Sequence, residues 1–301
     1  MKHLLSFILI AVMLGFGAQV VNADMEAEHP RNKPMLIPAD MGFVPFHYYN
    51  KQKQPEGFTI DMVTEIAKRL GRPGIEILNV NWSGIFAGLF AKKYEMVIGG
   101  VGITHERAES MDITEPIQTL TGAPAVRTED LAKIKSPKDF KGLIVGVNTG
   151  STSDTWATEN KATIGFEIMR FDKVADAVLA LKAKKIHVVV TDMPTVAAFV
   201  KEDPSRVAQP PFTVGLTTDW GVVNVEGTGG CFRKGDPYRY QVEAAIEGMK
   251  LDGTLQKLVG KWIVKPAPDN YCNIVYPGYG TPGIRAYEPE AYHMPIFAPK
   301  K

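Results

Sequence analysis

Arg107 and Asp192 are a cation and an anion that each follow a candidate buried strand, in different halves of the 301-residue chain. Arg107 closes a glycine-rich run after the apolar segment 95–98, and Asp192 follows the segment 187–191. A guanidinium group binds a carboxylate through two parallel hydrogen bonds, and a carboxylate binds an ammonium group. A crevice with one of these side chains on each wall is complementary to a small zwitterion, of which a free amino acid is the simplest example.

The residues that precede Arg107 strengthen this interpretation. Gly100 and Gly102 leave backbone donors and acceptors uncovered, and Thr104 is placed to cap the helix that contains Arg107. Taken alone, Arg107 is typical of a solvated helix arginine, and the glycines are typical of a tight turn. Asp192 taken alone is typical of a cap for a helix that begins at Pro194.

A second polar run follows the strand candidate 143–147 and contains Asn148, Gly150, Ser151 and Thr152. A glycine among small hydroxyl side chains, ahead of a helix, is typical of a turn that binds a carboxylate. The run lacks the Gly-Lys-Ser/Thr of a phosphate loop and the G-x-G-x-x-G of a dinucleotide site. An ordinary hydroxyl-capped helix is the alternative.

Three further residues have two interpretations each. Phe43 and Trp82 are core residues by frequency, or they face the cleft and enclose the ligand's side chain. Asp40 either ends a strand or makes a polar contact with that side chain.

Strand and helix patterns alternate along the chain and predict an α/β fold with two parallel-type sheets. The predicted helices are 61–70, 84–93 and one that begins at Asp172; the predicted strands are 95–98, 143–147 and 187–191. In open α/β sheets, ligands bind beyond the carboxyl ends of the strands. The polar residues above occupy such ends.

The N-terminus predicts export. A short apolar run over 4–17, followed by Val21-Asn22-Ala23, is typical of a cleavable signal peptide over residues 1–23. A membrane anchor is the weaker alternative, and a lipid anchor is not expected because no cysteine lies near the cleavage position. We therefore expect a periplasmic protein.

The composition of the chain argues against some classes of binding partner. The chain has 34 Lys and Arg against 33 Asp and Glu, and 45% of its residues are hydrophobic. A balanced charge argues against nucleic acid or an anionic membrane as a partner. No metal or other cofactor is expected, since neither cysteine has metal-ligand or redox spacing. Cys231 and Cys272 predict a disulfide in an oxidising compartment, with two buried thiols as the alternative.

The order of these sequence motifs along the chain resembles that of the family 3 periplasmic solute-binding proteins of amino acid ABC transporters, over about residues 35–264. The stretches that carry the resemblance are 43–46, 57–61, 82–85, 102–107, 112–116, 139–153, 191–192, 233–237 and 252–254.

The resemblance implies a role for each candidate residue. Arg107, with backbone near Gly102 and Thr152, would hold the ligand α-carboxylate, and Asp192 with the Gly100 carbonyl would hold the α-ammonium group. The complete implied ligand-binding set is Asp40, Phe43, Trp82, Gly100, Gly102, Arg107, Asn148, Ser151, Thr152 and Asp192. In this set Phe43 and Trp82 match an aromatic clamp, while Asp40 and Asn148 match positions that face the ligand's side chain.

The resemblance also implies a type II periplasmic binding protein fold, in which a two-segment hinge joins two α/β lobes. Lobe 1 would comprise 30–119 plus 224–301, with 265–301 packed on it as an extension, and lobe 2 would comprise 124–215. The lobes would close over the ligand, and a membrane permease would recognise the closed form. We expect a monomer without enzymatic activity.

Two positions depart from the family pattern. Gly102 stands where serine or threonine is common, and Thr59 stands where binders of basic amino acids often carry an acid, which makes lysine or arginine a less expected ligand. One alternative is an enzyme on the same fold, similar to cyclohexadienyl dehydratase, with His47, His105 or Glu106 as acid or base. Another is an extracytoplasmic sensor domain.

Overall fold

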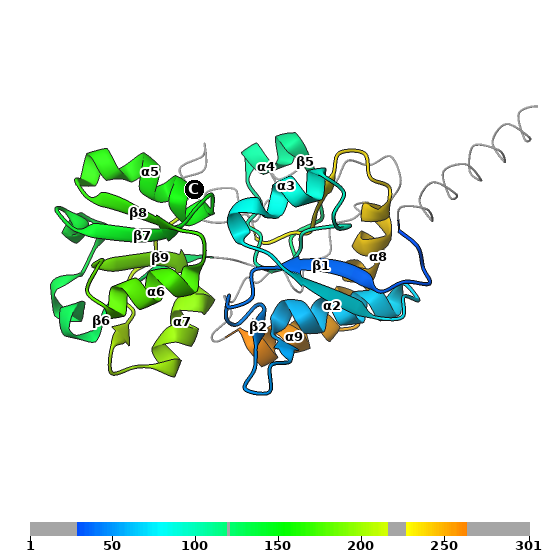
Figure 1. Cartoon of the computed structure of the whole chain (residues 1–301), viewed down its shortest axis with the longest axis horizontal. Helices are drawn as coiled ribbons and strands as arrows, with labels where there is room; N and C mark the ends of the chain where they lie inside the picture. Colours follow the sequence, from blue (N-terminus) through cyan, green and yellow to red (C-terminus); the bar gives the residue numbers. More distant parts are fainter. Residues whose placement is uncertain (1–28, 119–120, 216–226, 264–301) are drawn as a thin grey trace, which may run out of the picture.

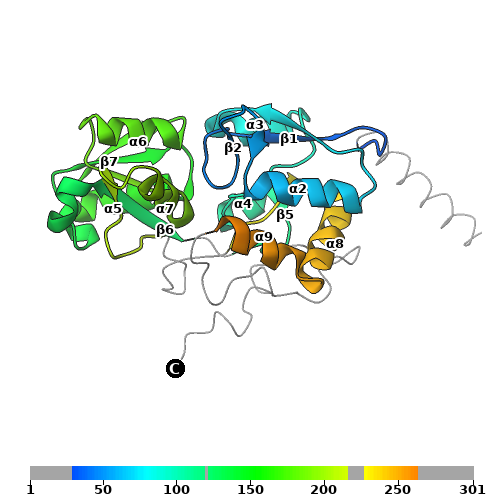
Figure 2. The same cartoon turned by 90° about the horizontal axis from the view of Figure 1, so that it is seen from below.

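The computed structural model describes residues 29–118, 121–215 and 227–263. The chain forms two α/β lobes that lie side by side in both views (Figure 1, Figure 2). The predicted signal peptide and the extension over 265–301 lie outside the described residues. No helix in the described ranges combines the length and the apolar character that a membrane span requires.

Lobe 1 is built from two stretches of chain. Its first stretch contains β1 (Met35–Ala39), β2 (Tyr48–Tyr49), β3 (Pro55–Glu56), α2 (Phe58–Arg69), β4 (Ile75–Asn79), η1 (Trp82–Gly84), α3 (Ile85–Phe90), α4 (His105–Ser110) and β5 (Met111–Ile113). Its second stretch contains β11 (Cys231–Arg233), α8 (Tyr238–Leu251) and α9 (Thr254–Trp262). Strands β1 and β4 are parallel, whereas β5 pairs with β11 and β2 pairs with β3 in antiparallel fashion.

Lobe 2 contains one five-stranded sheet. Its elements are β6 (Gly122–Arg127), η2 (Thr128–Lys133), η3 (Pro137–Phe140), β7 (Ile144–Asn148), α5 (Thr152–Ile164), β8 (Glu167–Phe171), α6 (Val174–Lys182), β9 (Val188–Asp192), α7 (Met193–Glu202) and β10 (Val207–Ala208). The strand order is β10-β6-β9-β7-β8, with β7 parallel to both of its neighbours. The carboxyl ends of β7 and β9 therefore meet at one edge, where Asn148 and Asp192 lie.

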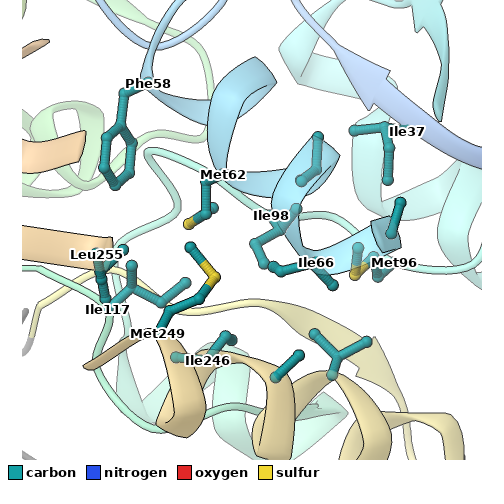
Figure 3. Packing of buried hydrophobic residues seen from close by; sticks show 14 of the residues in the cluster. Ile37, Phe58, Met62, Ile66, Met96, Ile98, Ile117, Ile246, Met249 and Leu255 are labelled. Carbon is teal, nitrogen blue, oxygen red and sulfur yellow. The ribbon is translucent and has the colours of Figure 1, made fainter. Parts of the chain in front are cut away.

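Each lobe has its own hydrophobic core. In lobe 1, Met62 and Ile66 of α2 lie one helical turn apart and pack in a fully buried cluster with Ile246 and Met249 of α8 (Figure 3). In lobe 2, successive residues of β9 alternate between two clusters. Val189 packs on the side of α6 and α7, whereas its neighbours in the strand pack on the side of α5. A strand buried on both faces explains the uninterrupted valine run.

Two segments connect the lobes. The chain passes from lobe 1 to lobe 2 between the described residues 118 and 121, and back to lobe 1 between the described residues 215 and 227. On the lobe 1 side the Thr228 amide donates to the Gln118 carbonyl at 2.8 Å, and on the lobe 2 side the Val214 amide donates to the Gly122 carbonyl at 2.9 Å. The predicted lobe boundaries fall near these crossings and stay predictions.

Three predicted elements differ from the structure. The helix predicted over 61–70 begins earlier, at Phe58, which is fully buried, as is Met62. The helix predicted over 84–93 is shorter: α3 ends at Phe90, and the 3-10 turn η1 precedes it. The predicted strand 95–98 is wrong: it forms only an isolated bridge between Val97 and Cys231, because Gly99 turns the backbone at a φ of +128° immediately afterwards.

Candidate functional site

A pocket of about 470 Å³, including its opening to solvent, lies between the two lobes. It is lined by Asp40, Phe43, His47, Trp82, Gly100, Gly102, Arg107, Asn148, Ser151, Thr152, Ser153, Thr191 and Asp192. All ten residues of the predicted ligand-binding set are among them. The structure thus brings together residues that follow β1, β7 and β9, while their role in binding stays a prediction.

Arg107 is held in the pocket wall by its own helix and by both lobes. Thr104 caps α4 by accepting a hydrogen bond from the Arg107 amide at 3.2 Å. The guanidinium group donates to the carbonyl of Gly102 at 2.6 Å and, across the cleft, to the carbonyl of Gly150 at 3.2 Å. It also lies 5.4 Å from the ring centre of Trp82. Arg107 is therefore an oriented, half-buried cation and not a solvated helix arginine.

Asp192 occupies the cap position of α7 without capping it. Its side chain makes no hydrogen bond to the helix, and within the described ranges its carboxyl group has no hydrogen-bond or ion-pair partner. Only 9% of the residue is exposed, and this burial raises the pKa of Asp192 to about 7, although the charge of Arg107 lowers it. A buried carboxyl group without a partner is costly in isolation and is available to a cationic ligand group.

The turn before α5 differs in detail from the predicted anion site. Gly150 adopts a φ of +72°, but its amide already donates to the Asp154 carboxylate at 3.0 Å. Ser151 caps the helix by accepting from the Asp154 amide at 3.2 Å. The amides of Thr152 and Ser153, in the first turn of α5, donate to no protein group in the described part of the chain. These two N–H groups are the open donors of this turn.

The aromatic residues connect the pocket to the cores. Phe43 stacks on Phe46 with ring centres 4.8 Å apart and packs against the cores of both lobes. Trp82 packs edge-on against Phe86 at 5.4 Å. A side chain at Gly100 would place its Cβ 2.6 Å from the ring of Phe43, so glycine is required for this ring position. Phe43 and Trp82 are partly exposed to the pocket and are not purely core residues.

Asp40 and Asn148 differ in the partners that their side chains already have. The Asn148 amide nitrogen donates to the carbonyl of Phe171 at 2.9 Å, which orients its side chain. Asp40 lies 3.6 Å from the ammonium group of Lys173, which belongs to lobe 2. Burial raises the pKa of Asp40 to about 6, and the charge of Lys173 opposes the rise.

Three lining residues were not in the predicted set: His47, Ser153 and Thr191. Ser153 and Thr191 adjoin predicted residues, so the neighbouring motifs were the available signal. His47 had been considered only as an enzymatic acid or base, and its position depends on the backbone pairing that folds it back against Phe43. Burial lowers the pKa of His47 to about 4, so the imidazole is neutral at pH 7. Of the other enzymatic candidates, Glu106 is exposed and does not line the pocket, and the side chain of His105 lies outside the described part.

Cys231 is a fully buried thiol in β11, and burial raises its pKa to about 12. Cys272 lies outside the described residues. The predicted disulfide between them stays a prediction.

Comparisons with known proteins agree with this architecture. The sequence profile of the bacterial extracellular solute-binding proteins, family 3, matches residues 36–265. A probable histidine-binding protein of Neisseria gonorrhoeae is 28% identical over 255 residues, which cover 83% of this chain and 90% of that protein.

Two solved structures share the fold at a TM-score of 0.70. An ancestral arginine-binding protein bound to arginine is 30% identical, and the match covers 77% of this chain and 99% of that one. An ancestral amino acid-binding protein, described as a precursor of cyclohexadienyl dehydratase, is 28% identical, with 80% of this chain and all of that one covered.

Proposed function

Since the chain belongs to the bacterial extracellular solute-binding proteins of family 3, we propose that it binds a free amino acid or a closely related zwitterion between its lobes. The observation that carries this proposal is the presence of Arg107 and Asp192 in one pocket, with no ion pair between them anywhere in the described structure. Similar proteins whose names describe them as binding histidine or arginine support the ligand class.

The α-carboxylate of the ligand would bind at the Arg107 end of the pocket. Arg107 now donates to two main-chain carbonyls, and an ionised carboxylate is a stronger acceptor than either. Thr152 and Ser153, whose amides are open, line the pocket from lobe 2 at the N-terminus of α5, where the helix dipole favours negative charge. A carboxylate here would receive donors from both lobes.

The α-ammonium group would bind at Asp192. The carboxyl group of Asp192 needs a cation to offset its burial, and in the described structure the Gly100 carbonyl accepts no hydrogen bond and offers a second acceptor. Charge-assisted hydrogen bonds contribute about 1.5–3 kcal/mol each, so this grip on the ligand backbone accounts for much of the affinity of a small molecule.

Binding would proceed by closure of the lobes. Arg107 and Gly100 belong to lobe 1, whereas Asp192 and Thr152 belong to lobe 2, so both ends of the ligand are held only when the lobes meet. The two crossings, one between Gln118 and Gly122 and the other between Val214 and Thr228, would form the hinge of this movement.

We further propose that the protein acts as a monomer in the periplasm, after removal of residues 1–23, and delivers its ligand to the permease of an ABC importer. The N-terminal pattern and the family support this placement. Binding without turnover is the proposed activity. One observation favours the enzymatic alternative, namely two pocket carboxyl groups, those of Asp40 and Asp192, whose pKa values of about 6 and about 7 suit proton transfer.

A ligand panel tests the proposal. Thermal-shift measurements with the twenty standard amino acids and related zwitterions should identify compounds that raise the melting temperature, because a ligand that binds only the folded state stabilises it. Calorimetry should then show one site per chain, and the decarboxylated amine of the best ligand should not bind. A panel without any binder, or equal binding of the amine, would contradict the proposal. Conversion of prephenate or arogenate would favour the enzyme.

A further inference from the structure

An ion pair beside the pocket joins the two lobes. Asp40 follows β1 in lobe 1, and Lys173 precedes α6 in lobe 2; the Lys173 ammonium nitrogen lies 3.6 Å from a carboxylate oxygen of Asp40. The two segments approach each other beside this pair, since a Cβ atom added at Gly42 would lie 3.9 Å from the Cβ of Ala175. The pair therefore lies where the lobes touch.

The carboxyl group of Asp40 depends on Lys173. Its side chain is 8% exposed, and in the described structure Lys173 is the one cation within ion-pair distance of it. The carboxylate of Asp176, further along α6, raises the pKa of Asp40 instead of stabilising its charge. The main-chain amide of Trp82 also lowers the pKa of Asp40, but Lys173 is its counter-ion. A buried carboxylate that loses its counter-ion is strongly destabilised, so without Lys173 the Asp40 carboxylate favours another cation in the same place or protonation.

A ligand with a cationic side chain would have to displace Lys173. Its cation would compete for Asp40 with an ammonium group that is tethered at short distance and thus has a high effective concentration. A ligand with an anionic side chain would face Asp40 itself. An uncharged polar side chain is compatible with Asp40 and Asn148 as they stand, because both line the pocket and offer hydrogen-bonding groups.

We propose that Lys173 determines the specificity of the pocket: it occupies the cation position at Asp40, selects ligands with an uncharged polar side chain, and holds the lobes together. The ligand selection rests on the proposed function, whereas the contact between the lobes does not. Lys173 does not line the pocket itself and acts through Asp40.

The test compares Lys173→Met with Lys182→Met. Methionine keeps most of the aliphatic stem and removes the charge. Lys182 is the matched control, because it lies on α6 and forms an ion pair with Asp203 at 3.1 Å, a residue that does not line the pocket. Calorimetry with L-glutamine and L-arginine at pH 8, where Asp40 is ionised, measures the ratio of the two affinities.

We expect the wild-type protein and Lys182→Met to prefer L-glutamine over L-arginine. In Lys173→Met the ratio should shift at least tenfold toward L-arginine, and the added change Asp40→Asn should abolish this shift. A wild-type preference for L-arginine, or a ratio that Lys173→Met changes less than threefold, would overturn the selection by Lys173.

Small-angle scattering of the unliganded proteins tests the contact between the lobes separately. Lys173→Met should have a larger radius of gyration than the wild-type protein, and Lys182→Met should not. If the wild-type protein binds no amino acid, the proposed function fails, and the scattering alone decides whether Lys173 holds the lobes together. An unchanged radius of gyration in Lys173→Met would then overturn this inference.

Discussion

Arg107 and Asp192 line one pocket from opposite lobes, and the charge of Arg107 lowers the pKa of Asp192 without an ion pair between the two side chains in the described structure. Burial outweighs this effect and raises the pKa of Asp192 to about 7. The Asp192 carboxyl group is thus near its titration point at neutral pH. A ligand ammonium group would supply the positive charge that Arg107 provides only at a distance.

Arg107→Ala should weaken amino acid binding by about two to four decades. The substitution leaves the ligand carboxylate desolvated without its cation, at a cost of about 3–5 kcal/mol. Calorimetry with the best ligand of the panel measures the effect. Arg206→Ala is the control, because Arg206 is exposed and pairs with Asp203 away from the pocket. Wild-type affinity in Arg107→Ala would disprove the carboxylate assignment.

Asp192→Asn should stabilise the unliganded protein at pH 8 and have little effect near pH 4. Because the folded pKa of about 7 exceeds the ordinary aspartate value of 3.8, the folded state binds more protons between these values. The free energy of unfolding therefore falls as pH rises through this window, and asparagine removes that loss. Urea denaturation at both pH values measures the difference.

Asp203→Asn provides a comparison with the opposite sign. The side chains of Ser205, Lys182 and Arg206 lower the pKa of Asp203 to about 2. Its contribution to stability is present above the unfolded pKa and is lost as pH falls through about 2. Asp203→Asn should therefore destabilise the protein at pH 8. If both variants changed stability in the same direction at pH 8, the effect of Asp192 could not be attributed to its burial.

Amino acid binding by the wild-type protein should weaken about tenfold between pH 8 and pH 6. A pKa of about 7 leaves roughly one tenth of Asp192 ionised at pH 6, and the apparent affinity scales with that fraction. Asp40, with a pKa of about 6, adds a smaller loss, whereas His47, with a pKa of about 4, is neutral throughout. Calorimetry in buffers of equal ionic strength tests this, and a constant affinity would contradict it.

Gly102→Ala should weaken binding about tenfold without unfolding either lobe. A Cβ atom at this position would lie 3.1 Å from the Cγ2 of Thr152 in the opposite lobe, so the lobes must separate slightly to admit it. Gly260→Ala is the control, because no atom lies within 4 Å of its added Cβ. Equal ligand affinities of the two variants, with equal melting temperatures, would show that the lobes tolerate the added methyl group.

The candidate site was largely predictable because its residues occupy positions that sequence patterns mark. Arg107 follows a capping threonine, and Asp192 ends a valine-rich strand whose two buried faces are typical of the interior of a sheet. The prediction of a strand over 95–98 was wrong because an apolar run by itself does not determine strand pairing. This apolar run reports burial, but pairing depends on the backbone direction, which Gly99 changes.

The sequence by itself determined the α/β class, the family and the ten residues that meet in the pocket, because strand ends, helix caps and glycine turns are local features with fixed spacing. The tertiary structure decided which groups remain available there. In the folded chain the Gly150 amide donates to the Asp154 carboxylate and is no longer available to a ligand. The neutral imidazole of His47 lines the pocket. The tertiary structure also set Lys173 of one lobe against Asp40 of the other. Such contacts depend on how two separately packed lobes approach each other. The distance between the lobes cannot be predicted from the spacing of residues along the chain.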